Sequence, residues 1–181
     1  ASTCNEILLM RHLLGKTDDR KQRAYLINHF LDQFKDTVYR QTMFAEFELK
    51  MSEIVESGRP LTADELCRIY HQLNAEYYGD STVIDGGIDM EWARIPHFFM
   101  NFYVFQYATG FSAAMALSQR ILNGGEQAVK DYLGFLSGGC SKKPIELLRG
   151  AGVDMTSPEP IKTALDTFGK LLDEFEELMK D

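Results

Sequence analysis

Residues 97–111 (HFFMNFYVFQYATGF) hold the side chains of this sequence that are best suited to chemistry. His97 is followed by Tyr103 and Tyr107, which are four residues apart and would share one face of an α-helix. Two phenol hydroxyls on one face, close to an imidazole, can converge on a single ligand atom and donate hydrogen bonds to it. The alternative is a structural role, because aromatic residues at helical spacing most often fill a core while tyrosine hydroxyls reach water.

The elements that would position these side chains are all predicted to be helices. Apolar residues recur at spacings of three or four, and strand-like alternation is scarce. Thr62 with Glu65 is typical of a capping box, and Pro96 should start or kink a helix. Within a helix, Phe98, Phe102 and Phe105 would fill a core stripe. The expected helical regions are residues 1–14, about 17–57, 62–78, 91–122, 126–136, 143–149 and 158–180.

Composition and charge exclude several classes of protein. Hydrophobic residues make up 45% of the 181 residues, which is typical of a folded domain. A net charge of −8 argues against nucleic acid as the main partner. The sequence contains no uncharged apolar run of about 18 residues, so no membrane span is predicted. The cysteines are three and widely spaced, so we expect free thiols in a reducing compartment: Cys4, Cys67 and Cys140.

Three stretches resemble oligoendopeptidase F, a relative of thimet oligopeptidase. They are YLINHFLDQFKDTVYRQTMFAEFE (25–48), EWARIPHFFMNFYVFQYATGFSAAMALSQRILNGG (91–125) and YLGFLSGGCSKKPIELLRGAGVDM (132–155). The resemblance implies that residues 1–181 are the C-terminal portion of the catalytic domain of a zincin-type oligopeptidase. Such an enzyme would be mostly helical, with long helices lining a substrate cavity, and would hydrolyse internal bonds of short peptides with zinc.

The family holds zinc with two histidines of an HExxH helix and a glutamate on a following helix. This sequence contains no HExxH, and its opening Ala1-Ser2-Thr3 is similar to the end of the Glu-Val-Ala-Ser-Thr segment that carries the third ligand. We therefore expect all zinc ligands and the general base to lie upstream. The whole enzyme would bind one zinc, whereas this chain alone would bind none and be inactive. No two histidines lie four residues apart: His12, His29, His71 and His97.

The resemblance also implies roles for four residues. His97 matches a family histidine that contacts the substrate carbonyl, and Tyr103 and Tyr107 match the tyrosines that follow it. These three candidate catalytic residues would stabilise negative charge on the carbonyl oxygen. Glu6 lies about two helical turns after the inferred ligand glutamate and would orient a zinc-bound histidine through its free N–H. The alternative for Glu6 is a solvated or salt-bridged carboxylate.

Other polar residues on the long 17–57 helix favour structural interpretations. Arg40 either lines the cavity or pairs with Asp36, one turn earlier. Glu46 and Glu48 flank Phe47 and cannot share a helical face, so a carboxylate metal site there is not expected.

A second interpretation of function is a non-catalytic helical module that binds peptides or other proteins, with residues 97–111 forming a groove for an apolar peptide. On the peptidase interpretation the partners are short peptide substrates, without nucleic acid or membrane, and the location is cytoplasmic. Isolated from the upstream helices, the first helix and the aromatic segment would expose apolar area, so we expect the chain to self-associate.

Overall fold

The computed structural model describes residues 1–180, and the predicted all-α fold is confirmed over them. The chain forms two compact units: a terminal unit of residues 1–35 with 109–181, and a central unit of residues 36–108. Among the described residues, no helix is both long enough and apolar enough to cross a membrane. The elements are α1 (Ser2–Leu14), α2 (Arg20–Phe34), the π-helix η1 (Lys35–Tyr39), α3 (Arg40–Glu56), α4 (Ala63–Tyr78), the 3₁₀ helices η2 (Ile88–Arg94) and η3 (Pro96–Phe99), α5 (Phe105–Asn123), α6 (Gly125–Ser137), α7 (Pro144–Gly150) and α8 (Glu159–Met179).

Side-chain caps set two helix starts. Thr62 caps α4 as predicted, because its Oγ1 accepts a hydrogen bond from the Glu65 amide at 3.3 Å. The long helix predicted from about residue 17 begins later, at Arg20. Asp19 caps it there by accepting a hydrogen bond from the Gln22 amide at 2.8 Å. The helical residues then run on through η1 into α3, so the long helix is present with one π-helical turn inside it.

The helix predicted over 91–122 is wrong in its first part. Residues 88–99 form two short 3₁₀ helices, and α5 begins only at Phe105. Pro96 starts η3. Asn101 and Phe102 have φ values of 50° and 58°, which a right-handed helix cannot accommodate.

The predicted core stripe of Phe98, Phe102 and Phe105 is therefore also wrong. Phe98 packs against the core of the central unit, whereas Phe102 and Phe105 are 37% and 47% exposed. The left-handed turn rotates the chain between these residues, so their sequence spacing no longer places them on one face.

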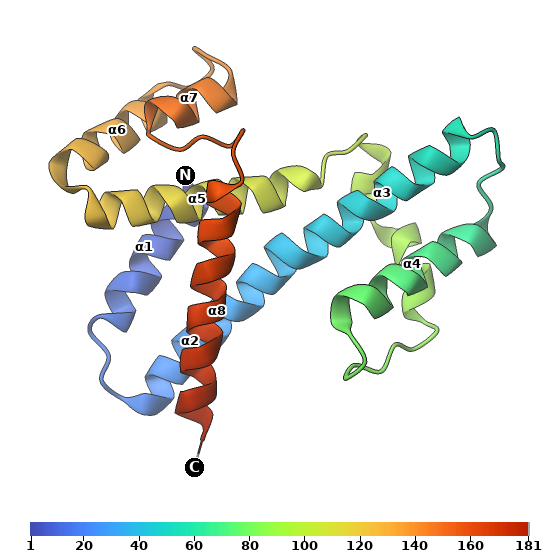
Figure 1. Cartoon of the computed structure of the whole chain (residues 1–181), viewed down its shortest axis with the longest axis horizontal. Coiled ribbons are helices and arrows are strands. Elements are labelled where there is room, and N and C mark those ends of the chain that lie inside the picture. The colour runs from blue at the N-terminus through green and yellow to red at the C-terminus, as the bar shows by residue number, and fades with distance from the viewer. Residues whose placement is uncertain (181) are drawn as a thin grey trace. The chain divides into compact units, whose positions relative to one another are not determined.

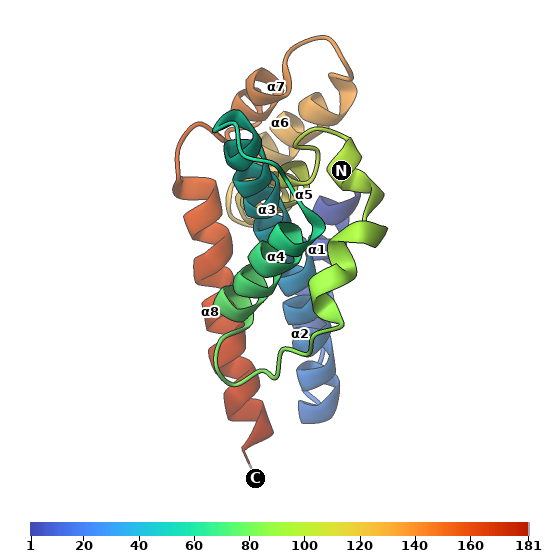
Figure 2. The same cartoon turned by 90° about the vertical axis from the view of Figure 1, so that its right-hand side faces the viewer.

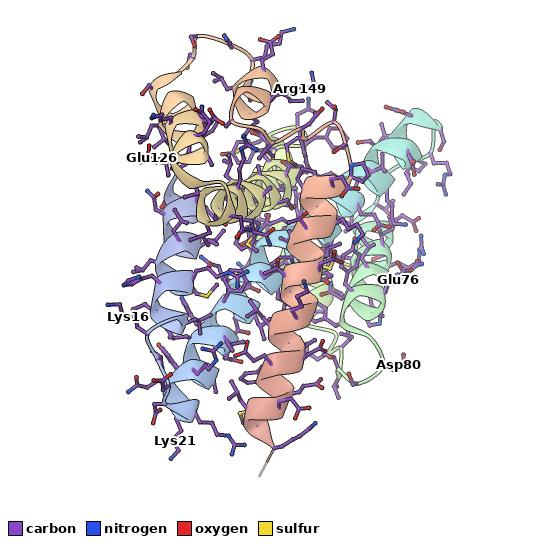
Figure 3. The ribbon with its side chains drawn as sticks, turned by 60° about the vertical axis from the view of Figure 1, so that its left-hand side comes forward. Lys16, Lys21, Glu76, Asp80, Glu126 and Arg149 are labelled. Atoms are coloured by element: carbon purple, nitrogen blue, oxygen red, sulfur yellow. The ribbon has the colours of Figure 1, made fainter. Side chains whose placement is uncertain are left out.

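In the terminal unit, α2 packs against both α1 and α8 (Figure 1). Phe34 of α2 lies with its ring centroid 5.4 Å from Phe111 and 4.7 Å from Phe168 of α8. Figure 3 labels Lys16, in the turn that follows α1, and Lys21, in the first turn of α2, and it marks α6 by Glu126 and α7 by Arg149. This unit positions Glu6, on the first turns of α1.

In the central unit, α4 packs against α3 and against η2 (Figure 2). Its core draws apolar side chains from these elements and from the segment that leads to α5. The buried members are Met43, Phe44, Phe47, Ile54, Ile69, Tyr70, Leu73, Ile95 and Val104. This core supports the segment that carries His97 and Tyr103.

Candidate functional site

The site loop, residues 95–104, is fixed to the core of the central unit by its two ends and its middle. Ile95 is 7% exposed and Val104 is 1% exposed. Between them, the Phe98 ring packs against Phe44 and Phe47 with centroid distances of 5.4 and 5.2 Å. The loop is therefore held as a rigid support, although it has little regular helical structure.

The loop and the first turn of α5 bring the three predicted catalytic residues together. The His97 ring stacks on Tyr103 with centroids 5.7 Å apart, and Tyr107 meets His97 edge-on at 6.0 Å. Tyr103 and Tyr107 are also in edge contact at 5.6 Å. The Tyr107 hydroxyl lies 3.4 Å from Nε2 of His97. The predicted cluster is thus present in the central unit. It is assembled by the site loop together with the start of α5, and not by one face of a continuous helix as expected.

The cluster presents hydrogen-bond donors to solvent. Both tyrosines are 39% exposed. Burial and a hydrogen bond with Tyr103 raise the pKa of Tyr107, so its hydroxyl keeps its proton at neutral pH and can donate it to an acceptor. Because the hydroxyl and Nε2 of His97 are 3.4 Å apart, one oxygen atom can lie about 2.8 Å from each of them. This geometry suits an oxygen that gains negative charge.

Apolar side chains on the same segment are exposed near the cluster. Phe99 is 89% exposed, Met100 is 52% exposed and Phe105 is 47% exposed. Large apolar side chains that face solvent in one stretch are typical of a binding surface. The segment that carries the donors therefore also offers apolar side chains for contact with another molecule.

A buried carboxylate network ties η2 to α3 and α4, just before the site loop. Glu91 is 8% exposed. It accepts hydrogen bonds from Arg40 at 2.5 Å and from the Tyr70 hydroxyl at 2.6 Å, and it also pairs with Arg94. Burial acts to raise the pKa of Glu91, but these donors outweigh it and hold the pKa below its usual value.

The network shows which carboxylate pairs with Arg40, while the interpretation that Arg40 lines the cavity stays a prediction. Its partner is Glu91 and the predicted pairing with Asp36 is not the one formed. Asp36 lies within the π-helical turn η1, where residues four apart do not stack as they do in an α-helix. Sequence analysis missed Glu91, because Arg40 and Tyr70 are 51 and 21 residues away and only Arg94 is close in sequence.

A second buried carboxylate contacts the site loop itself. Glu48 of α3 is 4% exposed, and its Oε1 accepts a hydrogen bond from the Phe102 amide at 3.0 Å. Its other oxygen is buried without a hydrogen-bond partner among residues 1–180. Burial raises the pKa of Glu48, and the Phe102 amide opposes this rise. The signal available in the sequence was a glutamate next to core residue Phe47.

Glu6 belongs to the terminal unit. Its two carboxylate oxygens accept hydrogen bonds from the Ser2 hydroxyl at 2.8 Å and from the Gln33 side-chain amide at 3.2 Å. It borders an apolar groove between α1 and α2, together with Leu9, Met10, Leu13, Leu26, His29, Phe30 and Gln33. Its carboxylate is thus held by neutral donors, and the role of orienting a zinc-bound histidine stays a prediction.

The residues present do not fit a zinc centre. Within residues 1–180, no group of three or more His, Cys, Asp or Glu side chains is arranged to hold a metal ion. His71 illustrates this, because its Nδ1 contacts the single carboxylate of Asp89 at 2.7 Å on the surface. The upstream position of the zinc ligands stays a prediction.

Known proteins resemble this chain over nearly its whole length. Oligopeptidase PepF of Bacillus subtilis is 54% identical over 179 residues, which cover 99% of this chain and 27% of that protein. The chromosomal oligoendopeptidase F of Lactococcus lactis subsp. cremoris is 44% identical, with 99% of this chain and 30% of the relative covered. This chain therefore spans less than a third of the length of either relative.

A solved structure gives the same match in three dimensions. The crystal structure of oligoendopeptidase-F from Enterococcus faecium superposes with a TM-score of 0.95 at 50% identity, covering 98% of this chain and 34% of that one. Residues 1–167 also match the sequence profile of Peptidase family M3. With a family match over most of its length, this chain belongs to peptidase family M3.

Proposed function

We propose that this chain is part of a zinc-dependent endopeptidase that hydrolyses internal bonds of oligopeptides, and that it supplies transition-state and substrate-binding residues. The cluster of His97, Tyr103 and Tyr107 carries the proposal, because its donors are solvent-accessible and lie beside exposed apolar side chains. Membership of peptidase family M3 supports the reaction class, and relatives named oligoendopeptidase support the substrate class.

The proposed chemistry follows from what the chain's own donors can do. Attack on a peptide carbonyl places negative charge on its oxygen. The Tyr107 hydroxyl and the His97 imidazole, 3.4 Å apart, would both donate to that oxygen, while Tyr103 holds Tyr107 by its hydrogen bond. Donors placed in advance stabilise the charge without reorganisation, and each contributes about 3–4 kcal/mol in comparable sites.

In this proposal zinc would be held by residues that lie upstream of this chain, in keeping with the resemblance to oligoendopeptidase F. Glu6, an exposed residue of the terminal unit, would then orient a zinc-bound histidine by accepting a hydrogen bond from its free N–H. We place the enzyme in the cytoplasm, in keeping with three widely spaced free cysteines.

The first test compares this chain with a longer polypeptide that carries an HExxH segment ahead of it. The longer form should bind stoichiometric zinc, measured by elemental analysis, and cleave an internally quenched oligopeptide. The chain alone should do neither. A longer form that binds zinc but leaves every peptide intact would contradict the peptidase function and favour the peptide-binding module. The module would then be tested by measuring its affinity for the uncleaved peptide.

We also expect the isolated chain to self-associate. The groove between α1 and α2 has apolar walls, and on these helices Leu9 is 57% exposed and Tyr25 is 73% exposed. Burying this surface in a second copy is favourable, since apolar area contributes about 25 cal/mol per Å². Sedimentation velocity should show species heavier than the monomer, and their fraction should fall for the Leu9→Ser variant. A chain that sediments as a monomer at high micromolar concentration would refute this expectation.

A further inference from the structure

The site loop contains a backbone conformation that needs support. Asn101 and Phe102 are consecutive non-glycine residues with φ values of 50° and 58°. Asparagine tolerates the left-handed region, but a bulky residue such as phenylalanine adopts it at a steric cost. The turn lies between His97 and Tyr103, so its conformation decides whether these two rings meet.

Glu48 contacts the loop at this turn. Its Oε1 accepts the hydrogen bond of the Phe102 amide at 3.0 Å, across 54 residues of sequence. The carboxylate comes from the middle of α3, a helix whose buried face is otherwise part of the aromatic core. The acceptor is therefore fixed in place by packing, and it selects the conformation in which the Phe102 amide points toward α3.

The chemistry of Glu48 is hard to explain as packing alone. The side chain is 4% exposed, its second oxygen has no hydrogen-bond partner among the described residues, and its pKa is raised by burial. An apolar residue would fill this core position without the cost of burying a carboxylate. What the carboxylate adds is one hydrogen bond to the strained turn.

We propose that Glu48 is a positioning residue that fixes the left-handed turn at Asn101 and Phe102, and so brings His97 and Tyr103 into register with Tyr107. It touches no substrate in this scheme and acts through the loop. Its effect on turnover rests on the proposed function, but its effect on the loop does not.

The structural test uses the isotopically labelled chain and amide hydrogen exchange. The Phe102 amide should be protected in the unmodified chain, although it lies in a surface loop. The Glu48→Met variant, of similar length but without an oxygen acceptor, should exchange that amide about 10- to 100-fold faster. Glu48→Gln keeps a carbonyl oxygen and should restore most of the protection. The matched control is Glu53→Met, an exposed position on the same helix, which should leave the rate unchanged.

The functional test uses the zinc-loaded longer polypeptide. Glu48→Met should lower kcat about 10- to 100-fold and change KM less than about threefold, and Glu48→Gln should recover most of the loss, because the donors act mainly in the transition state. Full-rate exchange of the Phe102 amide in the unmodified chain would overturn the proposal, and this measurement does not depend on any variant folding. Glu48→Gln behaving like Glu48→Met would also overturn it. Faster exchange with unchanged kcat would uphold the positioning role and contradict the function proposed for the cluster.

Discussion

Replacing Tyr107 by Phe is expected to lower kcat of the zinc-loaded enzyme about 100- to 1,000-fold, with little change in zinc content. The substitution removes one hydroxyl, which lies 3.4 Å from Nε2 of His97, and keeps the ring that contacts Tyr103. Tyr107 is 39% exposed, so loss of the hydroxyl leaves no buried polar group unpaired and costs little stability. His97→Ala should give a loss of at least the same size.

The matched control for this prediction is Tyr25→Phe, which removes a hydroxyl from a tyrosine that is 73% exposed on α2. It should leave kcat unchanged. The double variant Tyr107→Phe with His97→Ala should lose less than the product of the single losses, because both donors act on one oxygen. Loss of zinc in either single variant would contradict the assigned role, since a ligand-supporting residue would behave in that way.

Replacing Glu91 by Ala is expected to destabilise the central unit by about 3–5 kcal/mol. The change leaves the Tyr70 hydroxyl buried without its acceptor and Arg40 without its counter-charge. Trp92 is the only tryptophan of the chain and packs against this core, so its fluorescence in urea reports unfolding of the central unit. Glu65→Gln, which breaks an exposed pair with Arg68, is the control and should shift the midpoint much less.

The Glu91 network should also make stability depend on pH. The folded pKa of Glu91 is lower than the unfolded value, so the unfolded state binds more protons between the two values. The contribution of Glu91 to the free energy of unfolding is complete above the unfolded pKa, about 4.3, and is lost as the pH falls through the folded pKa. Glu48 has the opposite shift, so the test is the difference between the unmodified chain and Glu91→Gln. That difference should shrink on acidification; a difference independent of pH would be inconsistent with an ionised Glu91 at the centre of the network.

Local patterns predicted the helices well where one residue sets a boundary. The Thr62 cap of α4 and the boundary between the helices predicted over 91–122 and 126–136, which falls at Gly124 between α5 and α6, need only a few neighbouring residues. The turn at Asn101 and Phe102 could not be predicted in this way, because neither residue is a glycine and its support comes from Glu48 on α3. The helical pattern of residues 97–111 is thus interrupted before α5, at a turn that donates one long-range hydrogen bond to Glu48, and it holds from Phe105 onward.

In the candidate site, too, some features could be predicted from the sequence and others depend on residues far apart in the chain. His97, Tyr103 and Tyr107 were identified from residue type and family resemblance, and they do lie together. The reasoning from an i, i+4 face was only partly sound, since Tyr103 precedes α5 and is placed by the loop. The buried carboxylates Glu48 and Glu91 were missed because Phe102, Arg40 and Tyr70, with which they form hydrogen bonds, are distant in sequence.

The site loop alternates between side chains that enter the core and side chains that face water. Ile95, Phe98 and Val104 hold it down, while Phe99 and Met100 are 89% and 52% exposed. Substitutions at 99 and 100 therefore carry almost no penalty in folding, whereas substitutions at the inward positions do. The fold therefore constrains the inward positions of the loop, whereas the identity of residues 99 and 100 can change without loss of the core packing.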